Sequence, residues 1–249
     1  QNVLHWHIVD EQSFPIEIPS YPKLWNGSYS YSERYTMSDA IDIVRYAEKR
    51  GVNVLAEIDV PGHARSWLNN NHMNVSDAYR DFVLRSQKIA ISHGYDIINW
   101  YPLFDNFSRF QLGEDVAPKV VAAGHRCIVS NQDKWYLDHL DASWEGFYMN
   151  EPLKGINDTK QQQLVIGGEV CMWGEEIDAS DIQQTIWPRA AAAAERLWTP
   201  IEKLANDTRF VTSRLARFRC LLNQRGVAAA PLAGYGRASP SEPGPCVRQ

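Results

Sequence analysis

The feature that most constrains the fold of this chain is a unit of helix, glycine and buried strand that occurs three times. In the first unit, residues 37–50 carry apolar side chains spaced along one helix face, with Ser38 as the expected N-cap. In each unit a glycine precedes an apolar strand. The glycines are Gly51, Gly94 and Gly124, and the strands after them are residues 52–59, 96–100 and 126–131. Such repeats are typical of βα units, which build a parallel sheet.

Two further strands are expected at residues 3–9 and 164–173, and the second precedes an alanine-rich helix at residues 188–198. Polar or aromatic residues lie near the carboxyl end of each strand, namely His7 with Asp10, Glu57 with His63, Asn99 with Trp100, Ser130 with Asn131, and Glu169 with Trp173. The pattern predicts an α/β fold, and a doubly wound sheet and a (β/α)8 TIM barrel both fit it. The barrel places its site at the carboxyl ends of its strands, but it requires eight strands.

The composition excludes several classes of protein. A length of 249 residues allows one large α/β domain or two small ones. The net charge of −5, with no run of lysine or arginine, argues against a nucleic-acid partner. No stretch approaches eighteen apolar residues, so no transmembrane segment is expected. Nine tryptophans and eleven tyrosines fit either core packing or a sugar-binding cleft, because flat aromatic faces serve both purposes.

Titratable residues gather at the ends of the first two expected strands. His5 and His7 lie two residues apart and face the same side of their strand. They fit a metal pair or hydrogen-bonded histidines of the interior, but no cysteine or third histidine stands nearby at ligand spacing, so we expect no metal and no cofactor. Asp10 and Glu11 are candidates for general acid chemistry, although adjacent side chains near a strand end point apart. His63 fits a solvent-exposed turn or a histidine that tunes a neighbouring acid.

The stretch "GGEVCMWGEE" offers a second group of candidates. It combines two glycines that allow close backbone approach with Trp173 as a flat platform and Glu175 as an acceptor for hydroxyl groups. The sequence contains no GxSxG motif, phosphate-binding loop or dinucleotide-binding fingerprint. Common hydrolase and nucleotide-binding functions are therefore not predicted.

Five separated strings together resemble the β-N-acetylhexosaminidases of glycoside hydrolase family 20, and the plant enzymes most of all. The strings are "LHWHIVDEQSFPIEIPSYPKLWNGSYS", "VNVLAEIDVPGHARSW", "GYDIINW", "WYLDH" and "GGEVCMWGEEIDASDIQQTIWPRAAAAAERLW". The resemblance covers nearly the whole chain in the family's order. It implies a TIM barrel whose second and third strands are residues 3–9 and 52–59, and whose fifth, seventh and eighth strands end near Trp100, Asn131 and Trp173.

The resemblance also implies a substrate-assisted mechanism, in which the 2-acetamido oxygen of the sugar attacks the anomeric carbon. An aspartate polarises the acetamide, and the adjacent glutamate protonates the leaving oxygen. Asp10 and His63 would form the relay that holds this acid. The residues that would contact the sugar are Trp100, Tyr136, Asp138, Trp173 and Glu175. The implied partners are glycans with terminal N-acetylhexosamine, and the resemblance also allows a homodimer.

The sequence departs from the family pattern at its centre. The family's fourth strand ends in H-x-G-G-D-E, which carries the catalytic pair, whereas here Trp67 leads directly to Leu68 and the next helix. The family's first strand is missing and its sixth is not recognisable in residues 101–123. We therefore predict an incomplete barrel in residues 1–226 that lacks the catalytic Asp-Glu pair and is inactive. The alternatives are an active hydrolase that uses Asp10 with Glu11, and a non-catalytic carbohydrate-binding protein.

The sequence also carries marks of the secretory pathway. Gln1 runs straight into a strand without a methionine, so we expect a fragment, a processed product or an incomplete gene model. Five Asn-x-Ser/Thr glycosylation sequons occur, at Asn26, Asn74, Asn106, Asn157 and Asn206. Residues 227–249 form a Pro- and Gly-rich extension that we expect a Cys220–Cys246 disulfide to hold, as the resemblance implies, while the other two cysteines stay free. The expected location is extracellular or a vacuole- or lysosome-like compartment.

Overall fold

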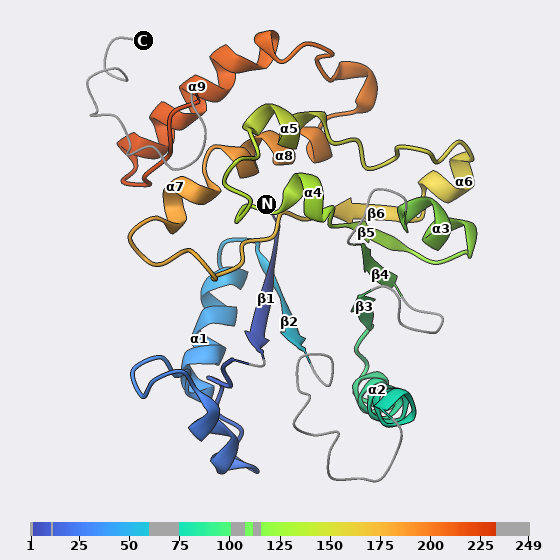
Figure 1. Cartoon of the computed structure of the whole chain (residues 1–249), viewed down its shortest axis with the longest axis vertical. Helices are drawn as coiled ribbons and strands as arrows, with labels where there is room; N and C mark the ends of the chain where they lie inside the picture. Colours follow the sequence, from blue (N-terminus) through green and yellow to red (C-terminus); the bar gives the residue numbers. More distant parts are fainter. Residues whose placement is uncertain (1, 11, 60–74, 101–107, 112–115, 233–249) are drawn as a thin grey trace. The chain divides into compact units, whose positions relative to one another are not determined.

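The computed structural model describes residues 2–10, 12–59, 75–100, 108–111 and 116–232, and the chain divides into two units (Figure 1). The first unit comprises residues 1–96 and the second residues 97–249. Each unit is described by itself below. This division falls within the second of the repeated helix–glycine–strand elements, after Gly94 and before β3 (Ile98–Trp100), and each unit has parallel strands of its own.

The first unit is built on two parallel strands, β1 (Val3–Val9) and β2 (Asn53–Ile58). Helix α1 (Met37–Glu48) packs on β2, and the short 3-10 helix η1 (Pro22–Gly27) lies in the connection between β1 and α1. The expected cap at Ser38 is wrong. Thr36 is the N-cap, because its side chain accepts from the backbone of Asp39 and the Asp39 carboxylate accepts from the backbone of Thr36. Helix α2 (Val75–Ser92) ends the unit.

The second unit contains a four-stranded parallel sheet in the order β3, β4, β5, β6 (Figure 1). Its strands are β3 (Ile98–Trp100), β4 (Ser108–Gln111), β5 (Cys127–Val129) and β6 (Val165–Gly168). β4 corrects the expectation that no strand lies in residues 101–123. Its sequence, Ser-Arg-Phe-Gln, is short and has no apolar run, and its pairing with β3 and β5 makes it a strand. β6 is also shorter than the expected strand at residues 164–173.

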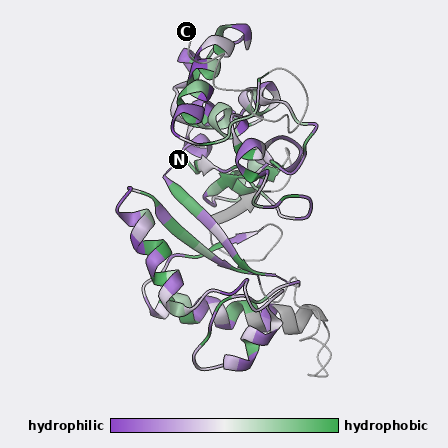
Figure 2. Ribbon diagram, turned by 90° about the vertical axis from the view of Figure 1, so that its left-hand side faces the viewer, coloured by the Kyte–Doolittle hydropathy of each residue, from purple (hydrophilic) through white to green (hydrophobic). Residues whose placement is uncertain are grey.

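Helices surround this sheet and supply the larger hydrophobic core. They are α3 (Val116–Ala122), α4 (Gln132–Trp135), α5 (Trp144–Met149), α6 (Thr159–Gln162), α7 (Ile182–Ile186), α8 (Arg189–Trp198), η3 (Ile201–Lys203) and α9 (Arg209–Gln224). Hydrophobic and hydrophilic residues follow one another closely along the helices (Figure 2). Helices α5 and α8 pack closely because α8 presents alanines, which leave room for Trp135, Phe147 and Tyr148 to be fully buried.

The described strands do not form a closed barrel, because they belong to two separate sheets of two and four strands. The α/β class and the parallel pairing are confirmed for these strands. No helix in the described part of the chain combines the length and apolar character needed to cross a membrane.

Candidate functional site

In the first unit, the register of β1 and β2 brings titratable side chains together. His7 lies directly opposite Glu57, and His5 lies two residues earlier on the same face of β1. The Nε2 atom of His5 is 2.8 Å from Oε2 of Glu57, and the Nδ1 atom of His7 is 3.1 Å from the same oxygen. Glu57 therefore links both histidines, which supports the hydrogen-bonded interpretation of this pair.

Asp10 completes the environment of His7. The Nε2 atom of His7 is 2.9 Å from Oδ2 of Asp10, just past the end of β1. Burial lowers the pKa of His7, but the hydrogen bonds and negative charges of Glu57 and Asp10 outweigh it and raise the pKa from 6.5 to about 9. The imidazole is thus a cation at neutral pH, held between two carboxylates from different strands.

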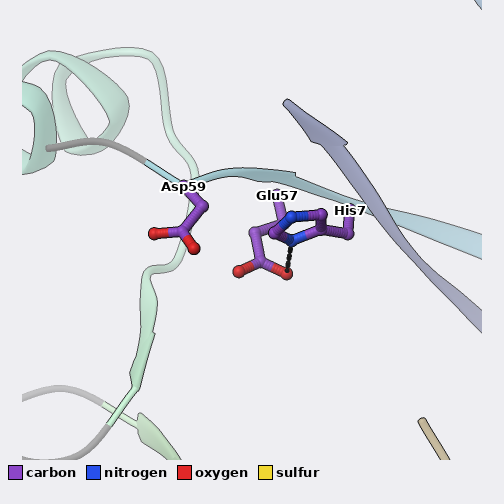
Figure 3. Close-up of side chains that lie close together, drawn as sticks. All are labelled: His7, Glu57 and Asp59. Atoms are coloured by element: carbon purple, nitrogen blue, oxygen red, sulfur yellow. Dashed lines mark ion pairs between the residues drawn. The ribbon is translucent and has the colours of Figure 1, made fainter. Parts of the chain in front are cut away.

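Asp59 extends this group at the carboxyl end of β2. Figure 3 shows His7, Glu57 and Asp59 close together, with an ion pair joining the first two. Each residue offers a nitrogen or carboxylate oxygen that could bind a metal ion, and the three atoms lie within 4.8 Å of one another. The sequence analysis compared spacing along one strand and therefore did not consider a group of side chains contributed by two strands. The signal was present in the alternation of His5 with His7 and of Glu57 with Asp59.

Of the two residues in the predicted relay, Asp10 and His63, the structure describes only Asp10. Asp10 contacts His7, while His63 lies outside the described residues, as does Glu11. The relay therefore remains a prediction. Sequence analysis did not anticipate that His7 bonds to Asp10.

In the second unit, Tyr136 and Trp173 come together at the carboxyl edge of the sheet. Tyr136 follows α4 and Trp173 follows β6, and an isolated parallel bridge joins Tyr136 to Cys171. The ring centroids of Tyr136 and Trp173 are 6.2 Å apart with the planes tilted by 46°. Two of the predicted sugar-contacting residues are thus neighbours, in a pair of half-buried to buried aromatic rings.

Buried polar groups surround Tyr136. Burial raises the pKa of its phenol, and nearby Cys171 and Glu169 add to the effect, so the hydroxyl keeps its proton. The Cys171 thiol lies 3.0 Å from Oγ of Ser130 and 3.6 Å from Oε1 of Glu169. Burial raises the pKa of this thiol too, and Cys171 is thus a poor nucleophile.

Asp138 stands two residues after Tyr136 and is half-buried. Its Oδ1 atom is buried and has no hydrogen-bond partner among the described residues. Such an atom is costly unless a ligand or water satisfies it. Arg189 of α8 holds this segment by donating to the carbonyls of Leu137, His139 and Ala142. Sequence analysis missed this role of Arg189.

The other residues predicted from the sequence differ in position and exposure. Trp100 ends β3 in the same sheet and is half-buried, and Glu175 is exposed two residues after Trp173. Asn26, Asn157 and Asn206 are exposed, as glycosylation requires, while Asn74 and Asn106 carry no described side chain. Cys127 and Cys171 are free thiols as expected, although Cys171 lies in an isolated bridge. Cys220 lies in α9 and Cys246 lies outside the described residues, so their disulfide remains a prediction.

Parallel strands that alternate with helices, as in both units, define the class of α/β proteins. The sequence matches "Glycosyl hydrolase family 20, catalytic domain" over residues 1–99 and again over residues 69–201. The chain belongs to this family.

Curated relatives agree with this assignment. The chain is 53% identical to Beta-hexosaminidase 3 and 45% identical to Beta-hexosaminidase 1, both of Arabidopsis thaliana, and both alignments cover all of this chain. It is 32% identical to Beta-hexosaminidase subunit beta of Homo sapiens over 94% of its length. The chain spans 60% of the length of each plant relative and 57% of the human one.

Solved structures share the fold. The chain matches a chitobiase of Flavobacterium johnsoniae with a TM-score of 0.78 at 21% identity, covering 91% of this chain and 47% of that one. It matches a beta-N-acetylhexosaminidase with a TM-score of 0.79 at 17% identity, covering 97% of this chain and 73% of that one. These likenesses imply a (β/α)8 barrel fold, of which the described strands form two separate parallel sheets.

Proposed function

We propose that this chain comes from a β-N-acetylhexosaminidase that acts on terminal β-linked N-acetylglucosamine or N-acetylgalactosamine of glycans. The observation that carries the proposal is the group of Tyr136, Trp173 and Asp138 in the second unit. Two tilted aromatic rings offer apolar faces to a sugar. The unpartnered Oδ1 of Asp138 offers an acceptor to a sugar hydroxyl.

Within this proposal the protonated phenol of Tyr136 donates to the acetamido oxygen of the sugar, which its raised pKa supports. Trp100 and Trp173 wall the pocket, and Glu175 accepts a further hydroxyl. Asp10 and His63 form the relay for the acid. These roles follow the family resemblance residue by residue.

We further propose that the chain as it stands does not hydrolyse glycans, because the catalytic Asp-Glu pair is missing between Trp67 and α2. The printed sequence contains no H-x-G-G-D-E string there. The alignment with Beta-hexosaminidase 3 extends over 322 positions, whereas this chain has 249 residues, so at least 322 − 249 = 73 positions of the relative have no counterpart. The family also matches as two overlapping segments, residues 1–99 and 69–201, and not as one continuous match.

Hydrolysis of an aryl N-acetyl-β-glucosaminide tests this proposal. General acid catalysis contributes about 10²–10⁴ in rate and electrostatic stabilisation about 10²–10³. Losing both costs on the order of 10⁴–10⁷, so we expect no measurable release of the aryl group. Turnover that disappears in Asp10→Asn would instead favour the alternative in which Asp10 and Glu11 act.

Binding is measured separately by tryptophan fluorescence during titration with N-acetylglucosamine. A retained half-site predicts weak saturable binding that Tyr136→Phe or Trp173→Ala reduces, whereas Trp198→Ala, at an exposed position of α8, leaves it unchanged. Saturable binding without turnover supports the non-catalytic carbohydrate-binding alternative. No binding in any variant contradicts the assignment of the half-site.

The proposal also includes the cellular location, a disulfide and the oligomeric state of the protein. The exposed sequon residues Asn26, Asn157 and Asn206 support passage through the secretory pathway to a vacuole- or lysosome-like compartment or to the outside. A Cys220–Cys246 disulfide would fit the same oxidising environment. A homodimer is part of the proposal, and size-exclusion chromatography with light scattering tests it.

A further inference from the structure

We propose that the first unit binds a divalent transition-metal ion, with Zn²⁺ as the best fit, through His7, Glu57 and Asp59. No role in the proposed glycan chemistry has been given to Glu57 or Asp59. The three ligand atoms already lie within 4.8 Å of one another (Figure 3). One imidazole nitrogen with two carboxylate oxygens is a donor set that Zn²⁺ accepts.

The distances within the cluster match those of a zinc site. Zinc binds nitrogen and oxygen ligands at about 2.0–2.2 Å, so two ligands of a tetrahedral site lie roughly 3.3–3.5 Å apart. Nδ1 of His7 and Oε2 of Glu57 are 3.1 Å apart, close to this spacing. Asp59 directly follows the end of β2, and its carboxylate supplies the third ligand atom within 4.8 Å of the others.

Residues around these ligands make hydrogen bonds of the kind that orient the ligands of a metal site. The other ring nitrogen of His7, Nε2, faces the Asp10 carboxylate at 2.9 Å, which directs Nδ1 toward Glu57. A carboxylate in this place commonly orients a metal-binding histidine. His5 contacts Glu57 at 2.8 Å and holds the second ligand in the same way.

The charge balance also favours a cation. Three carboxylates, those of Asp10, Glu57 and Asp59, lie near the imidazole of His7 in a half-buried cluster. A zinc ion would bring two positive charges to these carboxylates. The ligands stand on paired strands, which limits the rearrangement that binding requires.

The test is a titration of the untagged full chain with Zn²⁺ alone by calorimetry, repeated with Co²⁺ by visible absorption. We expect one ion per chain and a Co²⁺ spectrum of low coordination number. Glu57→Gln and Asp59→Asn should each weaken binding at least tenfold, since each removes one charged ligand. Asp42→Asn, in an exposed part of α1, is the matched control and should bind as the original chain does.

Two further readouts keep the result interpretable. Circular dichroism shows whether a variant is folded, and Asp59→Asn, beyond the end of β2, tests the site if Glu57→Gln does not fold. Nuclear magnetic resonance of the original chain should show the His7 ring signals shifted by Co²⁺. Absence of saturable binding, unshifted His7 signals, or equal binding by Asp59→Asn and Asp42→Asn overturns the proposal.

Discussion

At the scale of single residues, His7 is a group whose surroundings strongly change its pKa. Its pKa of about 9 lies above the ordinary 6.5 because Glu57 and Asp10 favour the charged form more strongly than burial disfavours it. The resulting stabilisation is fully present below pH 6.5 and is lost as the pH rises through about 9. We expect Asp10→Asn to lower the titration midpoint of His7. Nuclear magnetic resonance of the ring protons of His7 measures this midpoint. Asp42→Asn should leave the midpoint in place, and an unmoved midpoint in Asp10→Asn would contradict the pairing.

Gly168 lies at a position in the second unit where the core leaves no room for a Cβ atom. A Cβ at this position would lie 2.5 Å from Cζ3 of Trp135 and 3.1 Å from Cδ2 of Leu197. We expect Gly168→Ala to lower the free energy of unfolding by about 1–3 kcal/mol, because the indole is fully buried and has no room to shift. Gly167→Ala is the matched control in the same strand, since its Cβ would meet no atom within 4 Å. Equal denaturation midpoints for the two variants would refute this account.

At the scale of elements, α8 fixes the segment that carries Tyr136 and Asp138. The buried guanidinium of Arg189 donates to carbonyls of residues 137–142 and of Thr185, and burial lowers its pKa to about 10, which still leaves it charged at neutral pH. We expect Arg189→Met to cost about 2–4 kcal/mol of unfolding free energy, because several buried carbonyls lose their donor. Chemical denaturation measures the change. Arg209→Met, at the exposed start of α9, should leave stability as it is, and a similar loss there would contradict the role of Arg189.

At the scale of the whole molecule, the two units differ in how much apolar surface they bury. The buried hydrophobic residues of the described first unit are Val9, Ile16 and Ala47, whereas the second unit holds a continuous core around Trp135, Phe147 and Tyr148. We expect backbone amides of α1, β1 and β2 to exchange hydrogen faster than those of β5 and α8, because their local unfolding costs less free energy. Hydrogen exchange followed by mass spectrometry checks this. Uniform protection across both units would contradict it.

The sequence by itself determined the family, the parallel α/β class, five of the six described strands and the helices near residues 37–50 and 188–198. It did so because apolar periodicity and glycine stops are local, and because five separated motifs stand in one order. It also found Tyr136 and Trp173, whose side chains the structure brings together. Only the tertiary structure revealed β4, because four polar and aromatic residues become a strand through hydrogen bonds with neighbours on both sides. Only the tertiary structure revealed the cluster of His7, Glu57 and Asp59, because its members come from two strands that are distant along the chain. It also revealed the hydrogen bonds from Arg189 to carbonyls of residues 137–142, which are equally distant in sequence.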